Sequence, residues 1–245
     1  MMNFGLIGKS LSHSFSKTYF EKKFSENNLK DYLYNNFELE TIDQFKNVLQ
    51  TENLKGLNVT NPYKESIIPF LDELSVEAKE IGAVNCINIV NGKTIGYNTD
   101  AYGFGQSIKP FLDTTHERAL ILGTGGASKA AAFALKKIGV EVFFVTSSAK
   151  KNTNTFFYNE INERVMEAFK LIINTTPLGL YPNINDCPNL PYHLFTDKHL
   201  AYDLIYNPEQ TLFLKQAKEK GAVTINGLSM LHLQAQKSWE IWDGK

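Results

Sequence analysis

Apolar residues follow two alternating spacings along the chain. Short apolar runs bounded by glycine or polar residues predict buried strands, and apolar residues three and four positions apart predict amphipathic helices. The predicted strands are residues 4–8, 32–38, 56–60, 85–90, 94–97, 118–122, 140–146, 171–174, 200–203 and 223–225. The predicted helices are residues 16–27, 41–51, 75–81, 102–112, 128–138, 211–220 and 230–242. Strands that alternate with helices in this way indicate an α/β protein.

The chain divides into two parts near residue 101. In the first part, Asn91-Gly92 lies between two strand-like runs, as in a hairpin. After Asp100 the strand–helix unit repeats with the length that builds a doubly wound parallel sheet. We therefore expect one α/β domain over residues 1–101 and a Rossmann-like domain over residues 102–228.

A glycine-rich segment follows the first strand of the second part. It reads Gly123-Thr124-Gly125-Gly126-Ala127 and leads into an alanine-rich helix. Glycines let the backbone approach a pyrophosphate, and the N–H groups that begin the helix can bind its oxygens. Ser128 stands where the third glycine of a GxGxxG pattern would be. The context favours a dinucleotide site, and the alternative is a tight turn in another α/β fold.

The end of the next strand bears on which dinucleotide would bind. NAD sites usually have an acidic residue there, which accepts the ribose 2′-hydroxyl. Residues 142–149 contain no acid, and Thr146, Ser147 and Ser148 are followed by Lys150 and Lys151. Hydroxyls and cations suit a 2′-phosphate, which a carboxylate would repel. The sequence therefore favours NADP, although no arginine is present to bind the phosphate with two parallel hydrogen bonds.

Polar segments end several strands of the first part. They are residues 12–16, 58–64, 82–85 and 98–100. Taken singly, each is explained as a turn or a helix cap, and Lys64 or Asp100 alone as a solvated charge. Strand ends in open α/β sheets also commonly face ligands. Together these hydroxyls, amides, one lysine and one aspartate could surround a hydroxylated carboxylic acid.

With these segments in view, the chain resembles the shikimate dehydrogenase family along nearly its whole length. The resembling segments are residues 12–16, 58–64, 82–85, 98–100, 123–127, 174–179, 203–208 and 227–231 with Gln234-Ala235. The resemblance implies reversible, NADPH-dependent reduction of 3-dehydroshikimate to shikimate, a step in the biosynthesis of aromatic amino acids. It also implies that a terminal helix, residues 229–245, packs back on the first domain.

The resemblance further implies roles for individual residues. Lys64 is implied as the catalytic acid/base, with Asp100 as its partner. The implied substrate-binding residues are Ser14, Ser16, Thr60, Asn85, Asp100, Tyr206 and Gln234. The implied cofactor-binding residues are Gly123, Thr124, Gly125, Gly126 and Ala127 for the pyrophosphate, Thr146, Ser147, Ser148 and Lys151 for the 2′-phosphate, and Thr175, Leu204, Gly227 and Met230 for the nicotinamide.

Three other functions stay open at this point. Most family members carry an Asn-Arg pair where this chain has Thr146-Ser147, so a quinate/shikimate dehydrogenase that uses NAD is one alternative. A non-catalytic dinucleotide-binding regulator is another, but such a protein needs no proton-transfer group such as Lys64. A folate-type methylene dehydrogenase shares the two-domain layout, and it lacks the serine pair and the Asn98-Thr99-Asp100 segment.

Charge and composition exclude other classes. The net charge of −1 gives no basic field for nucleic acid, and no apolar run approaches the roughly 20 residues that span a bilayer. Cys86 and Cys187 form no disulfide framework, and the histidines lack metal-ligand spacing, so we expect no metal. Without a secretory signal pattern, we expect a cytoplasmic protein with a small-molecule substrate. A monomer and a homodimer both stay open.

Overall fold

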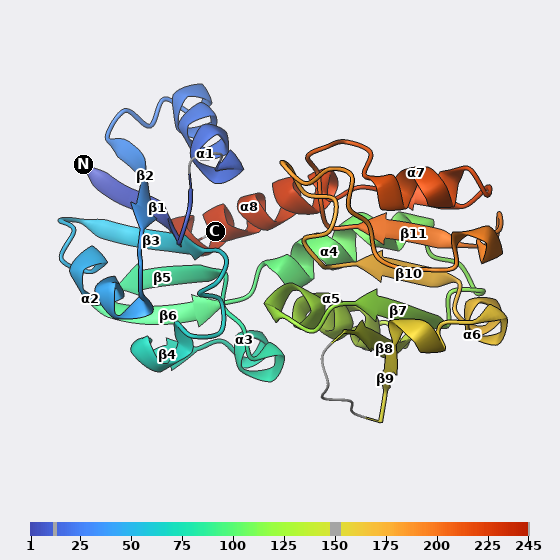
Figure 1. Cartoon of the computed structure of the whole chain (residues 1–245). Coiled ribbons are helices and arrows are strands. Elements are labelled where there is room, and N and C mark those ends of the chain that lie inside the picture. Colours follow the sequence, from blue (N-terminus) through green and yellow to red (C-terminus); the bar gives the residue numbers. More distant parts are fainter. Residues whose placement is uncertain (12–13, 148–152, 245) are drawn as a thin grey trace. The chain divides into compact units, whose positions relative to one another are not determined.

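The computed structural model describes residues 1–11, 14–147 and 153–244. The described chain forms two six-stranded sheets (Figure 1). It divides into two compact units. Unit 1 consists of Met1–Thr99 and Gln234–Lys245, and unit 2 of Asp100–Leu233. The mixed α/β class predicted from the sequence is confirmed.

The sheet of unit 1 is mixed. Its strands are β1 (Met2–Gly8), β2 (Tyr32–Glu38), β3 (Leu54–Val59), β4 (Glu73–Leu74), β5 (Cys86–Val90) and β6 (Lys93–Tyr97), in the order β2-β1-β3-β5-β6-β4. β1 runs parallel to β2 and β3, and β5 runs antiparallel to β3 and β6. Asn91 and Gly92, with φ of 52° and 79°, form the tight turn of the β5–β6 hairpin. The ends of β1 and β3 therefore lie at one edge of the sheet.

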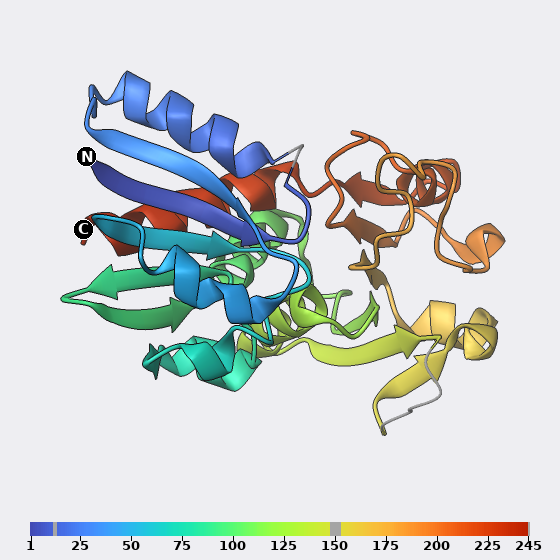
Figure 2. The same cartoon turned by 60° about the vertical axis from the view of Figure 1, so that its left-hand side comes forward.

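The helical elements of unit 1 cover both faces of this sheet. They are α1 (Phe15–Glu26), η1 (Ile42–Gln44), α2 (Phe45–Val48), η2 (Ile68–Phe70), α3 (Val76–Ile81) and the second part of α8 (Leu228–Asp243). Figure 2 shows α1 lying along β1 and β2. One apolar cluster joins the strands to α1 and to Trp239 and Trp242 of α8. A Cβ atom at Gly56 would overlap the Trp242 indole, so this glycine lets α8 approach β3 closely.

The predicted helix over residues 41–51 is wrong in length. The structure has a single 3-10 turn followed by the four-residue α2. The two apolar residues that pack deepest, Phe45 and Val48, are still buried. The chain must reverse within a few residues to enter β3, and Asn53 takes a positive φ of 52° in that reversal. The apolar spacing predicted the buried face correctly but not where the helix ends.

The sheet of unit 2 is entirely parallel. Its strands are β7 (Arg118–Leu122), β8 (Glu141–Thr146), β9 (Thr155–Phe157), β10 (Leu171–Asn174), β11 (Leu200–Asp203) and β12 (Val223–Ile225). The order β12-β11-β10-β7-β8-β9 is that of a doubly wound Rossmann sheet. The strand order reverses between β7 and β10, and ligands bind at such a switch point in open α/β sheets.

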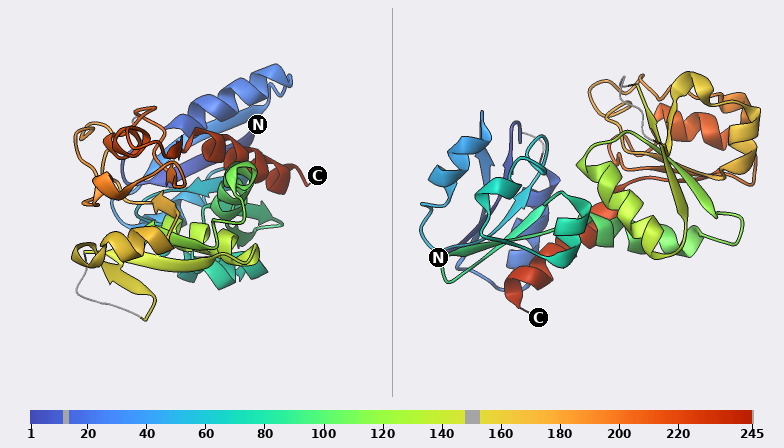
Figure 3. Two further views of the ribbon diagram at one scale, coloured as in Figure 1. Left: turned by 90° about the vertical axis from the view of Figure 1, so that its right-hand side faces the viewer. Right: turned by 90° about the horizontal axis from the view of Figure 1, so that it is seen from below.

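Helices flank both faces of the unit 2 sheet (Figure 3). The helical elements are α4 (Asp100–Ile108), η3 (Lys109–Phe111), α5 (Gly126–Lys137), η4 (Tyr158–Glu160), α6 (Glu163–Ala168), η5 (Tyr192–Leu194), α7 (Leu212–Lys218) and the first turns of α8. Every residue of β10 and β11 is buried. Two separate apolar clusters fill the two faces, one with α4 and α5 and one with α6 and α7. This explains why β10 and β11 are mainly apolar in sequence up to their last residues, Asn174 and Asp203.

Candidate substrate and dinucleotide sites

The glycine turn lies at the switch point of the unit 2 sheet. Gly123 follows β7 and has a φ of +107°, which L-residues rarely adopt. Its N–H donates to the Val145 carbonyl at the end of β8, at 2.9 Å. A Cβ atom at Gly123 would lie 2.9 Å from Oγ1 of Thr175, which follows β10. The structure therefore brings three predicted cofactor segments together: the glycine turn, the end of β8 and Thr175.

The helix that follows this turn suits an anion. α5 has twelve residues, and Gly125 is its N-cap. No atom lies within 4 Å of a Cβ built on Gly125, so space is open beside the first turn. The first N–H groups of a helix lack partners within it and carry the positive end of its dipole. This arrangement fits a pyrophosphate group, as predicted for Gly123 to Ala127.

Ser128 connects the two loops at the switch point. Its Oγ lies 2.6 Å from Oγ1 of Thr175, which in turn donates to the Leu122 carbonyl at 2.6 Å. Because the Thr175 proton is used in that bond, Ser128 donates to Thr175. A glycine, the usual residue at this place in a GxGxxG pattern, could not make this contact. The sequence marked Ser128 as a departure but gave no sign of its partner.

The described end of β8 carries hydroxyl groups. Thr146 is its last residue and is buried, and Ser147 follows in an exposed bend. The one acid of β8 is Glu141 at its start, where it pairs with Arg118 at 3.0 Å. Ser148, Lys150 and Lys151 lie outside the described residues. The part of this strand end that the structure describes therefore offers no carboxylate to a ribose 2′-hydroxyl.

Of the residues predicted for the nicotinamide, Thr175 follows β10, Leu204 follows β11, and Gly227 and Met230 lie at the start of α8. Gly227 lies against Leu204, because a Cβ atom there would overlap the Leu204 carbonyl, and its N–H donates to the Ile205 carbonyl at 3.0 Å. Burial raises the pKa of Tyr206 above its ordinary value. Met230 is 8% exposed and belongs to the apolar core of unit 2. The structure thus brings Leu204 and Gly227 together and gives Met230 a packing role.

A buried carboxylate fixes the turn in which Leu204 and Tyr206 lie. Asp203 is fully buried at the end of β11 and accepts three hydrogen bonds. The donors are Thr211 Oγ1 at 2.6 Å, Ile205 N at 3.0 Å and Asn174 Nδ2 at 3.0 Å. Burial raises the pKa of Asp203 to about 6, although these hydrogen bonds favour the ionised form. Asp203 therefore orders the backbone of this turn.

Several predicted substrate residues lie at strand ends in unit 1. The Thr60 N–H donates to the Ile7 carbonyl at 2.8 Å, which places Thr60 beside the end of β1. Ser14 is the N-cap of α1, and its Oγ accepts from Lys17 N at 3.5 Å. Ser16 lies in the first turn of α1. Ser12 and His13 lie outside the described residues.

Asn85 and Gln234 meet although they are far apart in sequence. Asn85, just before β5, and Gln234, in α8, are 3% and 8% exposed. Asn85 Nδ2 lies 3.5 Å from Gln234 Oε1 and donates to Thr99 Oγ1 at 3.0 Å. Asn85 Oδ1 accepts the Thr99 N–H at 2.6 Å. Two predicted substrate residues therefore form one buried polar group in unit 1.

The predicted catalytic pair is divided between the two units. Lys64 is half-buried in a turn of unit 1, and its carbonyl accepts the Val84 N–H at 2.7 Å. Asp100 begins α4 in unit 2 and is 6% exposed. The backbone of Lys64 is therefore held by a hydrogen bond in a turn, and that of Asp100 by a helix. Their pairing stays a prediction.

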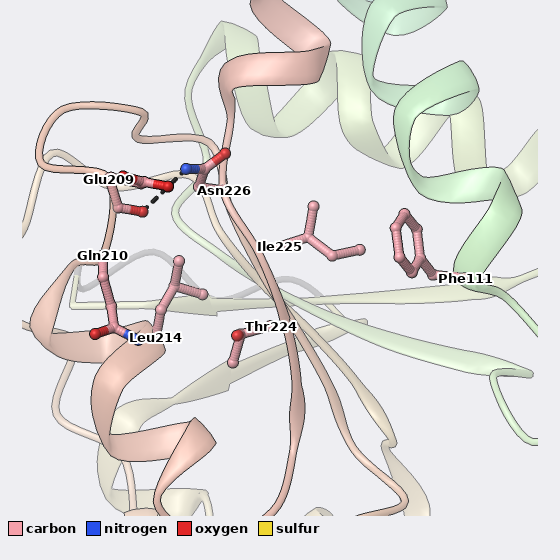
Figure 4. Close-up of a pocket in the computed structure, with 7 residues that line it drawn as sticks. All are labelled: Phe111, Glu209, Gln210, Leu214, Thr224, Ile225 and Asn226. Carbon is pink, nitrogen blue, oxygen red and sulfur yellow. Dashed lines mark hydrogen bonds between the residues drawn. The ribbon is translucent and has the colours of Figure 1, made fainter.

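A cavity of about 520 Å³ beside β12 involves none of the predicted site residues. Figure 4 shows Phe111 and Glu209 on opposite sides of the strand and the bond from Asn226 Nδ2 to the Glu209 carbonyl, which is 2.9 Å long. In the described residues, no group of three or more His, Cys, Asp or Glu side chains is arranged to hold a metal ion. None of the described helices is long and apolar enough to cross a membrane.

Comparison with known proteins identifies the family. The sequence model of the shikimate dehydrogenase substrate binding domain matches residues 6–87. Shikimate dehydrogenase (NADP(+)) of Carboxydothermus hydrogenoformans is 42% identical over 255 residues, which cover 98% of this chain and 91% of the relative. The chain belongs to the shikimate dehydrogenase family. The resemblance stated from the sequence is confirmed.

Solved structures of shikimate dehydrogenases have the same fold. The crystal structure of the enzyme from Aquifex aeolicus aligns with a TM-score of 0.89 at 35% identity, covering 100% of this chain and 93% of that chain. Shikimate 5-dehydrogenase from Thermus thermophilus, in complex with NADP(H) and shikimate, aligns with a TM-score of 0.87 at 32% identity, covering 100% and 94%. The Rossmann-like unit and the N-terminal unit are therefore both family features.

Sequence reasoning gave no role to several buried polar residues that contact the predicted site residues, although Asn58 and Thr99 lie in the polar segments 58–64 and 98–100. Besides Ser128, they are Tyr34, Asn58, Thr99 and Ser238, whose contacts join elements distant in sequence. Two signals were present. Asn58 is an amide in the buried part of β3, between Leu57 and Val59, and Ser238 lies one helical turn after Gln234.

Proposed function

We propose that this chain catalyses the reversible reduction of 3-dehydroshikimate to shikimate with NADPH. The observation that carries the proposal is the glycine turn at the switch point of a doubly wound sheet, where Gly123 needs its positive φ and lies beside Thr175. Family membership over nearly the whole chain supports the substrate. The hydroxyls at the described end of β8 support NADP over NAD.

Lys64 is the acid/base in this proposal. Bound NADPH supplies the hydride, which leaves alkoxide character on the ketone oxygen. The Lys64 ammonium stabilises that charge and donates the proton, and in the reverse direction the neutral amine accepts the hydroxyl proton. Asp100 orients Lys64 and accepts a hydroxyl of the substrate. A side chain held in a turn by the Val84–Lys64 backbone bond is placed in advance for this role.

The polar residues of unit 1 bind the rest of the substrate. Hydroxyl and carboxylate oxygens of shikimate need donors as well as acceptors, and buried amides in defined orientations provide both. In the proposal, Asn85 and Gln234 contact these groups from inside the unit. Ser14, Ser16 and Thr60 contact them from α1 and the end of β3. Tyr206 contacts the substrate from unit 2.

An absorbance assay of NADPH formation tests the proposal. The purified protein is given shikimate with NADP, and the rate is compared with that for shikimate with NAD and for quinate with either cofactor. We expect the highest kcat/KM for shikimate with NADP. Higher kcat/KM with NAD would overturn the cofactor assignment, and higher kcat/KM with quinate would overturn the substrate. Binding of NADPH without turnover of either acid would favour a regulator.

A further inference from the structure

A buried hydrogen-bond network in unit 1 connects two of the predicted substrate residues, Asn85 and Gln234. It consists of Tyr34 on β2, Asn58 on β3, Thr99 before α4 and Ser238 on α8. All four side chains are buried, and Ser238 is fully so. Asn58 Nδ2 donates to Ser238 Oγ at 2.9 Å, and Ser238 Oγ lies 3.2 Å from Thr99 Oγ1. The network thus joins β2 and β3 of the sheet to the terminal helix.

The network fixes the orientation of two amides. The Thr99 N–H can only donate, so the Asn85 atom 2.6 Å from it must be the oxygen. The other amide atom, Asn85 Nδ2, can only donate, and it lies 3.0 Å from Thr99 Oγ1 and also faces Gln234. The Gln234 atom that faces it is therefore the oxygen, Oε1, which lies 3.5 Å from Asn85 Nδ2 and 3.4 Å from Thr99 Oγ1. Both amide orientations are determined by Thr99.

Ser238 and Tyr34 complete this arrangement. Ser238 Oγ donates to the Gln234 carbonyl at 3.0 Å, so its lone pairs are left for Asn58 and Thr99. The Tyr34 hydroxyl donates to Asn58 Oδ1 at 2.8 Å, which directs Asn58 Nδ2 toward Ser238. Burial raises the pKa of Tyr34 well above its ordinary value. The chain of contacts therefore begins at Tyr34 and ends at two predicted substrate residues, Asn85 and Gln234.

We propose that Ser238 is a positioning residue for the substrate, and that it acts through Asn58 and Thr99 to hold the Asn85 and Gln234 amides in one orientation. The inference rests on the proposed function, because it assigns a role toward the shikimate site. Each hydroxyl of the network has a partner in the protein. The network therefore keeps the Asn85 and Gln234 amides in one orientation before the substrate binds.

Steady-state kinetics of three variants test the role. Ser238→Ala and Thr99→Val each remove one buried hydroxyl, while Thr99→Ser keeps the hydroxyl and removes only a methyl group. For the first two we expect KM for shikimate to rise on the order of three- to tenfold, because a buried donor or acceptor loses its partner. KM for NADP should not change. Thr99→Ser should stay near the wild-type KM for shikimate.

Thr94→Val is the matched control in the same unit. Thr94 is buried on β6, and its hydroxyl donates to Asp72 at 2.8 Å, outside the network. We expect it to lower stability without changing either KM. Equal KM for shikimate in wild type and Ser238→Ala would overturn the inference, as would equal rises in both KM values. A wild-type protein that does not oxidise shikimate would overturn the proposed function itself and the inference with it.

Discussion

At the scale of the residue, the reactivity of a polar side chain depends on its burial, and Lys64 is the first example. Lys64 is half-buried in a turn, whereas an ordinary lysine is solvated. If it transfers the proton, Lys64→Ala should lower kcat on the order of a hundred- to ten-thousand-fold while shikimate still binds. The control is Lys55→Ala, an exposed lysine on β3 of the same unit. A turnover of Lys64→Ala close to that of wild type would remove this residue from the mechanism.

Asp203 gives a second prediction at this scale. Its pKa is about 6 in the folded protein and 3.8 in an unfolded chain, so the folded state binds the proton more tightly. The stability that Asp203 contributes is therefore greatest at low pH, and on the order of 2–3 kcal/mol is lost as pH rises from about 4 to about 6. Asp203→Asn removes this titration. Its free energy of unfolding relative to wild type should rise across that window, as measured by urea denaturation at each pH. A constant difference would contradict the prediction.

The sequence predicted single residues where the chemistry is local. Gly123 could be predicted, because a glycine between a strand and a helix commonly forms the tight turn of a dinucleotide site. The partners of Ser128 and Ser238 could not be predicted, since a serine in a helix has many uses and Thr175 and Asn58 are far away in the chain. A hydrogen bond between segments that are distant in the chain produces no periodic pattern of residues in the sequence.

At the scale of the element, buried strands were easier to predict from the sequence than elements in polar segments. The parallel strands β7, β10 and β11 each contain a buried apolar run and were predicted at their observed positions. β9 and α6 were not predicted, because the segment that contains them is polar and short of apolar periodicity. β9 and α6 are stabilised by packing against β8 and its neighbours. The sequence of one segment alone does not show such tertiary contacts.

The turn between β7 and α5 gives a prediction for an element. Gly123→Ala places a Cβ atom 2.9 Å from Thr175 Oγ1 and forces a positive φ on alanine. Gly139→Ala at the other end of α5 imposes a similar strain, with φ of +85°, and meets no atom within 4 Å. Both variants should lose on the order of 1–2 kcal/mol of stability. Only Gly123→Ala should weaken NADPH binding, measured by titration of cofactor fluorescence. Equal affinities in the two variants would contradict the assigned role of the turn.

At the scale of the whole molecule, each unit has its own apolar cores. Two clusters lie in unit 1 and two in unit 2. The single helix α8 contributes its first turns to unit 2 and the rest to unit 1. Separate cores allow each unit to unfold with its own free energy, and a ligand that binds one unit stabilises that unit.

The placement of Trp239 and Trp242 makes α8 a built-in optical probe. They are the only two tryptophans in the chain, and both pack in the aromatic cluster of unit 1. Indole emission should therefore report the melting of unit 1 alone, while far-ultraviolet circular dichroism reports both units. In guanidinium titrations with added NADPH, we expect the dichroism curve to move to higher denaturant and the emission midpoint to stay in place. Coincident curves under both conditions would show that the two cores melt as one cooperative block.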